Sequence, residues 1–218
     1  MEERPLFGFD DSFRVDSFIS LHEQRAHCYI LAKDYDAALP DLDWVSKHGE
    51  ISKRDEADVI KGLIDILQGR EPSGLKRTAH EGDRLSLLLL NQPENTESPK
   101  TDWLLLPPKE RIQKLIAESH YAAAIEEIDR LDISPPRWGW NSDNELVALR
   151  GVCYALRGNY VQAISDYKCR GVFFKQEHEL AVIYSMAGEQ ERALRVLKDA
   201  DSTDIHATLI RQWIEKTS

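Results

Sequence analysis

The sequence has few cysteines and no long apolar run, and both absences exclude classes of protein. Its three cysteines stand far apart without a Cys-x-x-Cys pair, so a disulfide framework is not expected. The longest apolar runs, Leu87–Leu90 and Leu104–Leu106, are far shorter than the about 20 residues that a membrane span needs. The first ten residues carry two glutamates and no apolar run of signal-peptide type. We therefore expect a soluble, cytoplasmic protein with reduced thiols.

Sequence motifs for catalysis are also missing. The chain contains no GxxxxGK[ST], GxGxxG, HExxH or GxSxG string. His22 and His27 are five residues apart, which places them on different faces of a helix and makes a shared metal ion unexpected. Cys28 and Cys153 flank the tyrosines of a repeated pattern and are predicted to be buried, inert thiols. We predict a protein that is not an enzyme and needs neither cofactor nor metal.

Basic residues are outnumbered, and this imbalance bears on possible partners. The formal net charge is −10, and the isoelectric point is near 5.2. Nucleic-acid phosphates and anionic lipids attract clustered lysine and arginine, so neither nucleic acid nor a membrane surface is expected as a partner. A protein surface that is neutral or basic is the better electrostatic match.

What the chain does contain is one pattern that recurs. A large residue is followed after four positions by a turn residue, after two more by an aromatic residue, after three by alanine and after four by another large residue. Such self-similarity is typical of stacked helix arrays. The four copies are Tyr29, Lys33, Tyr35, Ala38 and Leu42; Leu115, Ser119, Tyr121, Ala124 and Ile128; Tyr154, Gly158, Tyr160, Ala163 and Tyr167; and Tyr184, Gly188, Gln190, Ala193 and Leu197.

Apolar residues recur at intervals of three and four, which predicts helices, and no stretch alternates with period two, so strand content should be near zero. The segment from Gly62 to Gly69 matches the first half of a further repeat. Its second helix is expected at 83–91, because residues 71–74 (Glu-Pro-Ser-Gly) should not propagate a helix. The other predicted helices are 11–32, a helix ending at Gly49, 52–68, 108–118, 121–131, 143–157, 160–171, 174–187, 190–199 and 203–216.

Turn-forming residues dominate 92–106, which we interpret as a linker or insertion between helix pairs at 1–91 and 107–218 of one continuous array. Small residues such as Gly62, Gly151 and Ala163 are predicted to lie where helices cross, because axes about 8–10 Å apart leave no room for a large side chain. Trp213 belongs to a last helix that is predicted to cap the array.

These residues resemble the tetratricopeptide repeat family. The best copy matches six of its signature positions, with Gly151, Tyr154, Gly158, Tyr160, Ala163 and Tyr167. The resemblance implies an all-α fold, a right-handed α-solenoid of antiparallel helix pairs with four to five irregular repeats plus a C-terminal capping helix. The spacing of the turn residues is uneven, unlike the regular repeat of about 34 residues in the family.

The resemblance also implies a concave surface for a peptide, lined by the first helix of each pair. Glu23 and His27 stand where a family branch uses a lysine and an asparagine to clamp a terminal carboxylate, so that ligand is not expected. Arg137, Trp138 and Trp140 lie in a predicted loop, where they either pack onto the array or contact a partner. The implied surface positions are Glu23, His27, Lys109, Gln113, Glu145, Ala148, Val152, Lys175, His178 and Val182.

Three functions stay open at this point. The first is a non-catalytic adaptor or scaffold that binds a peptide segment or a domain of a partner protein. The second is a dedicated inhibitor or toxin-neutralising, immunity-type protein, for which an acidic surface would complement one basic enzyme. The third is an RNA-binding helical repeat protein, against which the net charge of −10 argues.

Overall fold

The computed structural model describes residues 11–131, 142–168, 177–200 and 203–217, which form helices and turns without a β-strand. This confirms the predicted all-helical class. In chain order the elements are α1 (Asp11–Leu31), α2 (Tyr35–His48), α3 (Ile51–Gln68), α4 (Ser73–His80), α5 (Arg84–Leu90), η1 (Thr101–Leu105), α6 (Pro108–Ala117), α7 (Tyr121–Arg130), α8 (Ser142–Leu156), α9 (Tyr160–Lys168), α10 (Glu177–Met186), α11 (Gln190–Val196), η2 (Leu197–Asp199) and α12 (Ile205–Thr217).

Consecutive helices pack as pairs around a left-handed turn residue. The pairs are α1 with α2, α3 with α4, α6 with α7, α8 with α9, and α10 with α11. The Asn159 N–H donates to the Tyr154 carbonyl at 2.8 Å, a bond that ends a helix when the residue between has positive φ. The turn residues all have positive φ, as the repeated pattern predicts: Lys33 (+60°), Gly69 (+72°), Ser119 (+61°), Gly158 (+78°) and Gly188 (+77°).

Small residues lie at the helix crossings, which confirms that prediction. A Cβ atom on Gly62 would stand 2.2 Å from Leu75 Cγ, and one on Gly151 would stand 2.9 Å from the Tyr167 ring. The alanines of the second helices, Ala38, Ala124, Ala163 and Ala193, are fully buried. In α3–α4 and α8–α9 a glycine therefore packs against a large side chain, as close helix packing requires.

The placement of the helix after α3 corrects the prediction for this segment. The sequence predicts an interruption at 71–74, yet α4 begins at Ser73 directly after Pro72. Gly74 stands five residues after its turn residue, as Ala163 does, and a Cβ there would lie 2.6 Å from the Asp58 carbonyl oxygen. The glycine therefore permits a close crossing rather than breaking the helix, and Pro72 precedes the first turn, where no backbone N–H is needed. Helix α5 is an additional element after this pair.

An ion pair recurs at fixed distance from the turn. An arginine eight residues before the turn residue binds a carboxylate eight residues after it, and these carboxylates are between 2% and 8% exposed. In α10 and α11 the same two positions hold Leu180 and Val196. The pairs are Arg25 with Asp41 at 2.6 Å, Arg111 with Glu127 at 2.6 Å, and Arg150 with Asp166 at 2.7 Å.

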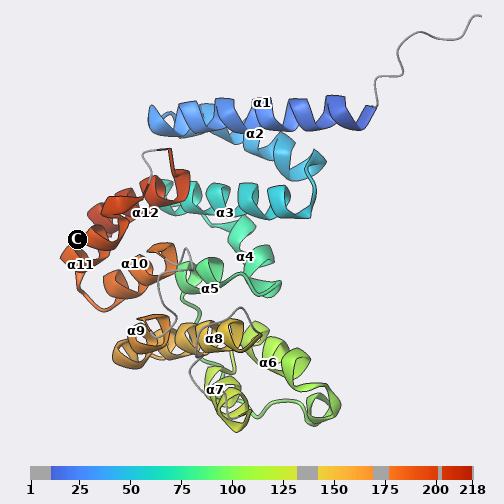
Figure 1. Cartoon of the computed structure of the whole chain (residues 1–218), viewed down its shortest axis with the longest axis vertical. Coiled ribbons are helices and arrows are strands. Elements are labelled where there is room, and N and C mark those ends of the chain that lie inside the picture. The colour runs from blue at the N-terminus through green and yellow to red at the C-terminus, as the bar shows by residue number, and fades with distance from the viewer. Residues whose placement is uncertain (1–10, 132–141, 169–176, 201–202, 218) are drawn as a thin grey trace, which may run out of the picture.

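The order of the helices in space differs from their order in the chain. Helices α1 and α2 lie at one end of the long axis and α6 and α7 at the other (Figure 1). Helix α12 lies in between, where it packs against α3 and α10. The Tyr35 hydroxyl donates to Gln212 Oε1, and the Lys216 ammonium donates to the Leu67 carbonyl. The predicted cap is thus wrong, because the polar side of α12 bonds to α2 and to the end of α3.

The segment 92–106 is tied to its neighbours. The Asn95 N–H donates to the Ser119 carbonyl at 2.8 Å, and Glu94 accepts from the Ala122 N–H at 2.7 Å while pairing with Arg157 at 3.0 Å. Trp103, within the short helix η1, is buried. These bonds place α6 and α7 firmly beside α8.

Candidate functional site

A pocket of about 570 Å³ lies where the turn between α4 and α5 meets α6, α8 and α10. We call it the junction pocket. Its volume falls in the range of ligand-binding clefts, about 300–1,000 Å³. Its charged lining residues are Glu81, Asp83, Arg84, Glu110, Lys114, Glu145 and Glu179.

Local sequence explains how the α4–α5 turn forms one wall. Gly82 has φ of +94°, a left-handed conformation that glycine adopts without steric cost. Asp83 then caps α5, because its Oδ2 accepts from the Ser86 N–H at 2.7 Å. The turn is thereby fixed, and residues 79–84 all reach the pocket.

Two ion pairs connect the walls. Arg84 of α5 pairs with the buried Glu179 of α10 at 3.2 Å, and Lys109 of α6 pairs with Glu145 of α8 at 3.0 Å. Glu110 is exposed and has no ion pair among the described residues. Five carboxylates and two cations line the pocket, and Lys109 and Arg77 outside it pair with Glu145 and Glu81, so a small negative excess remains that favours a positively charged group.

Some predicted surface positions meet at this pocket. Gln113 and Glu145 line it, and Lys109 holds Glu145 at its rim. Val152 and Val182, like Ala148, are fully buried in helices against which α5 packs, which corrects their prediction as part of an open groove. Helix α5 lies where a helix is expected at 83–91, but it is an additional helix and not the partner of α3, which is α4.

Other predicted positions do not line the pocket. Glu23 pairs with Lys53 at 3.0 Å, linking α1 to α3, and burial lowers the pKa of His27 beside them. His178 Nε2 lies 3.0 Å from Asp204 Oδ2. The predicted residues Lys175, Arg137, Trp138 and Trp140, and also Cys169, lie outside the described residues.

No motif in the sequence marks Asp83, Arg84, Glu110 and Glu179 as residues of a site. The dipeptide Gly82-Asp83 combines a turn residue with an N-cap residue, a pattern that predicts the start of a helix at α5. Glu179 meets Arg84 across 95 positions of the chain, and no local pattern encodes such a contact. Repeat positions predict which residues of the first helices lie on the surface. They do not predict the contacts that an additional helix such as α5 makes with those residues.

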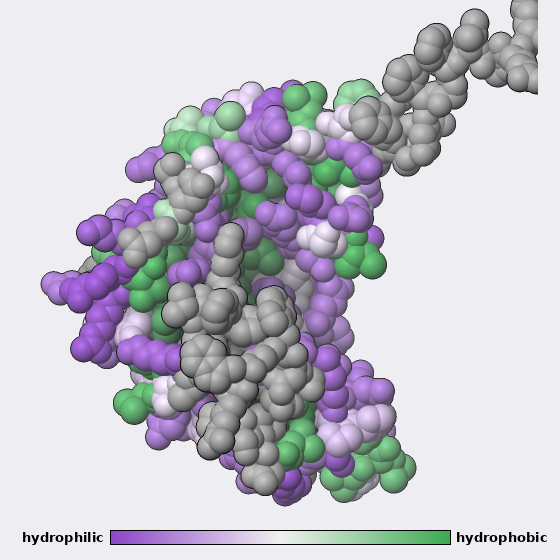
Figure 2. Space-filling model, viewed as in Figure 1, coloured by the Kyte–Doolittle hydropathy of each residue, from purple (hydrophilic) through white to green (hydrophobic). Residues whose placement is uncertain are grey.

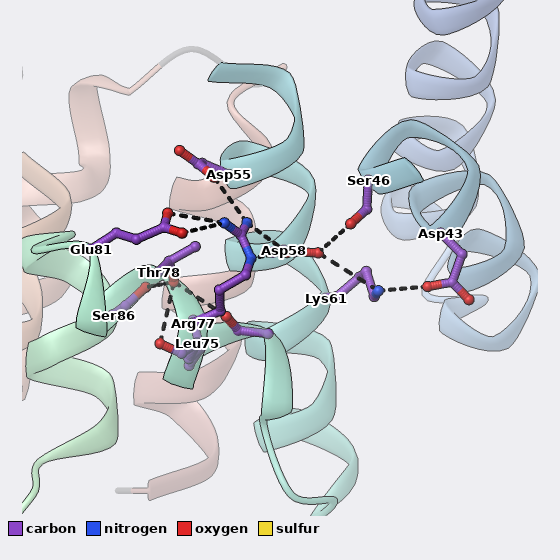
Figure 3. Close-up of polar contacts among 11 residues, drawn as sticks. Asp43, Ser46, Asp55, Asp58, Lys61, Leu75, Arg77, Thr78, Glu81 and Ser86 are labelled. Atoms are coloured by element: carbon purple, nitrogen blue, oxygen red, sulfur yellow. Dashed lines mark hydrogen bonds and ion pairs between the residues drawn. The ribbon is translucent and has the colours of Figure 1, made fainter. Parts of the chain in front are cut away.

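A polar network supports the pocket from behind (Figure 3). Arg77 of α4 binds Asp58 at 2.7 Å, Asp55 at 2.9 Å and the pocket residue Glu81 at 2.9 Å. These carboxylates raise the pKa of the Arg77 guanidinium, with the hydrogen bond to Asp55 the largest cause. Lys61 joins the same network through Asp58. The network holds α4 on α3 and so fixes the start of the α4–α5 turn.

Thiols and histidines outside the pocket show no metal-binding arrangement. Among the described residues no group of three or more His, Cys, Asp or Glu side chains converges on one point. Cys153 is buried, which raises the pKa of its thiol. Cys28 is exposed, so its predicted burial is wrong: it lies on the side of α1 away from α2. Within the described part of the chain no helix is both long and apolar enough to cross a membrane.

Comparisons with models of protein families, with curated proteins and with solved structures find no match for this chain. The proposals below therefore depend on the geometry described above.

Proposed function

We propose that this protein is a non-catalytic adaptor that binds a segment of a partner protein at the junction pocket. The observation that carries the proposal is the pocket itself, whose walls come from α4–α5 on one side and from α6, α8 and α10 on the other. Five carboxylates line it, and Glu110 and Glu145 are exposed. We expect a lysine or arginine of the partner to enter it.

The proposed architecture is a tetratricopeptide-like array. Five helix pairs among the described residues share a turn residue of positive φ, and we count them as five irregular repeats, interrupted by α5 and the 92–106 segment. Such arrays carry binding surfaces because each pair packs only on its neighbours and leaves one side open. The exposed thiol of Cys28 fits the reducing environment of the cytoplasm.

The test is affinity capture from the native source, with the partner identified from the wild-type chain. The variant Glu110→Lys/Glu145→Lys reverses charge at two exposed pocket positions without touching the core. The control Glu215→Lys reverses an exposed charge in the last turn of α12, where a cation suits the helix dipole. Wild type and control should recover the same partner, and the pocket variant should lose it at least tenfold. Equal recovery by all three would refute the pocket as the binding site.

The rival proposal is an inhibitor of one basic enzyme, which the net charge of −10 favours. Stoichiometry separates the two: an adaptor recovers several partners or one assembly, and an inhibitor recovers a single enzyme in equal amount. The third function, RNA binding, predicts a gel shift at physiological salt that the acidic pocket should not give.

A further inference from the structure

Helix α1 carries an apolar face that no helix of the described residues covers. Phe18 is 54% exposed, Leu21 57% and Leu31 50%, and Cys28 is exposed with them. Spacings of three, seven and three residues put all four on one side of the helix. Helix α1 lies at an end of the molecule (Figure 1), and hydrophobic side chains appear along that outer edge (Figure 2).

The opposite side of α1 is the one that the fold uses. Ile19, Ala26 and Ile30 are buried, and α2 packs along the helix. The apolar positions of the outer face are therefore not required by the core. In a chain with net charge −10, this face carries no carboxylate between Ser17 and Ala32, and its one cation, Arg25, is already paired with Asp41.

The order of residues on the outer face is the same from both ends. Counted from the midpoint between Gln24 and Arg25, Phe18 mirrors Leu31 and Leu21 mirrors Cys28. Two copies of the helix laid antiparallel would thus place an apolar residue against an apolar residue at all four contacts. This is the self-complementarity that a twofold, isologous interface requires.

Two charges flank the outer face along the axis, although neither lies on it: Asp16 is on the other side of α1 from Phe18, and Lys33 is the turn residue that follows the helix. Asp16 and Lys33 are both exposed and stand at equal distance from the midpoint. In the antiparallel pair, Asp16 of one copy reaches the same level along the axis as Lys33 of the other. In a parallel pair, Asp16 would instead stand at the same level as Asp16 of the other copy, and Lys33 at the level of Lys33, which places like charges together.

We propose that the outer face of α1 binds a second copy of this chain, as an antiparallel helix pair with Leu21 against Cys28 and Phe18 against Leu31. The face runs about 20 Å along the helix, at 1.5 Å per residue. Such a helix pair buries less area than a standard stable interface, so the dimer is weak and forms in the micromolar range. It leaves the junction pocket of both copies uncovered, and its existence does not depend on the proposed function.

Sedimentation equilibrium on the full chain tests the association, from about 5 to 200 μM, a range suited to a weak interface. The wild type should approach twice the chain mass of 25.0 kDa. Leu21→Glu should remain at the monomer mass. Val161→Glu is the matched control, because Val161 is an equally apolar residue, 79% exposed, on α9; it should behave as the wild type. A wild type that stays monomeric, or a dimer that survives Leu21→Glu, overturns the proposal.

Disulfide trapping tests the register. In the antiparallel pair the two copies of Cys28 stand about 10 Å apart along the axis, beyond the Cα separation of about 4.4–6.8 Å that a disulfide needs. Mild oxidation should therefore link wild-type chains poorly through Cys28. Leu21→Cys should give a reducible dimer in high yield, and Leu21→Cys/Cys28→Ser should lose it. Efficient linkage of wild-type chains through Cys28 itself would show a parallel pair and refute the proposed register.

Discussion

The helix pairs α3–α4 and α8–α9 each join their two helices by an arginine–carboxylate pair, but the arginine stands on opposite helices. In α8–α9 the cation is on the first helix, where Arg150 pairs with Asp166 of the second at 2.7 Å. In α3–α4 the cation is on the second helix, where Arg77 binds Asp58 of the first at 2.7 Å. Arg77 stands eight residues after its turn glycine, the position of Asp166 in the other pair. The position of Arg150 is held in α3 by Lys61, and Asp58 stands three residues before it and contacts both Lys61 and Arg77. A cation on the second helix is thus accompanied by a carboxylate one turn earlier on the first helix.

The same two pairs also differ in how closely their helices cross. Both have glycine seven residues before the turn, at Gly62 and Gly151. Five residues after the turn, α9 tolerates Ala163 while α4 has Gly74, which faces the Asp58 backbone at a distance that excludes a Cβ. The crossing of α3 with α4 is therefore the tighter of the two.

The largest effect is expected from reversing charge in the α8–α9 pair. Asp166→Arg places a second cation beside Arg150 at a buried position and should lower the free energy of unfolding by about 3–5 kcal/mol. The double variant Arg150→Asp/Asp166→Arg exchanges the two charges, so that unlike charges meet again, and it should recover part of that loss. Recovery should be incomplete, because Asp129 lies 2.7 Å from Arg150 and would repel the new carboxylate.

Urea unfolding followed by circular dichroism measures both variants, with Gln162→Arg at an exposed position of α9 as the control for added charge. A double variant no more stable than Asp166→Arg alone would contradict the view that the position tolerates either polarity.

The sequence predicts those features of the fold that depend on one residue's own geometry. Gly158 and Lys33 are found as turns because they hold the same place in the repeated pattern, and both have positive φ. Gly62 is found because a close crossing excludes a side chain. The same reasoning fails at Gly74, where a glycine that permits a crossing is indistinguishable in sequence from one that ends a helix. Context from α3 decides between the two.

The candidate site is predictable to a smaller extent. Gln113 and Glu145 are surface positions implied by the resemblance to the tetratricopeptide repeat family, and both line the pocket. The other wall depends on α5. Its Arg84 pairs with Glu179 of α10, a residue distant in the sequence, so no local pattern predicts this contact. The position of α12 beside α3 is equally non-local. An apolar stripe predicts that one face of a helix is buried, but it does not identify the helix that covers this face.

A smaller effect is expected at the first-helix glycines, and it compares the two crossings directly. Alanine at either site gains about 1 kcal/mol of helix propensity, but the added methyl must displace a neighbour, at a cost of about 1–3 kcal/mol. The overlap is greater at Gly62, 2.2 Å from Leu75 Cγ, than at Gly151, 2.9 Å from the Tyr167 ring. Gly62→Ala should therefore be the more destabilising in thermal unfolding, and equal midpoints for the two variants would contradict a tighter α3–α4 crossing.

The smallest effect is expected at the turns, where the two pairs should behave alike. Gly69 and Gly158 have φ of +72° and +78°, and a Cβ at either would meet no atom within 4 Å. Alanine at each site should thus cost the same, about 1 kcal/mol, because only the left-handed backbone opposes it. Lys33→Gly is the inverse control and should gain a similar amount, since Lys33 holds φ of +60° with a side chain. Urea unfolding measures the loss in free energy of unfolding for Gly69→Ala and Gly158→Ala. If these two losses differ as much as those of Gly62→Ala and Gly151→Ala, then the turns as well as the crossings distinguish α3–α4 from α8–α9.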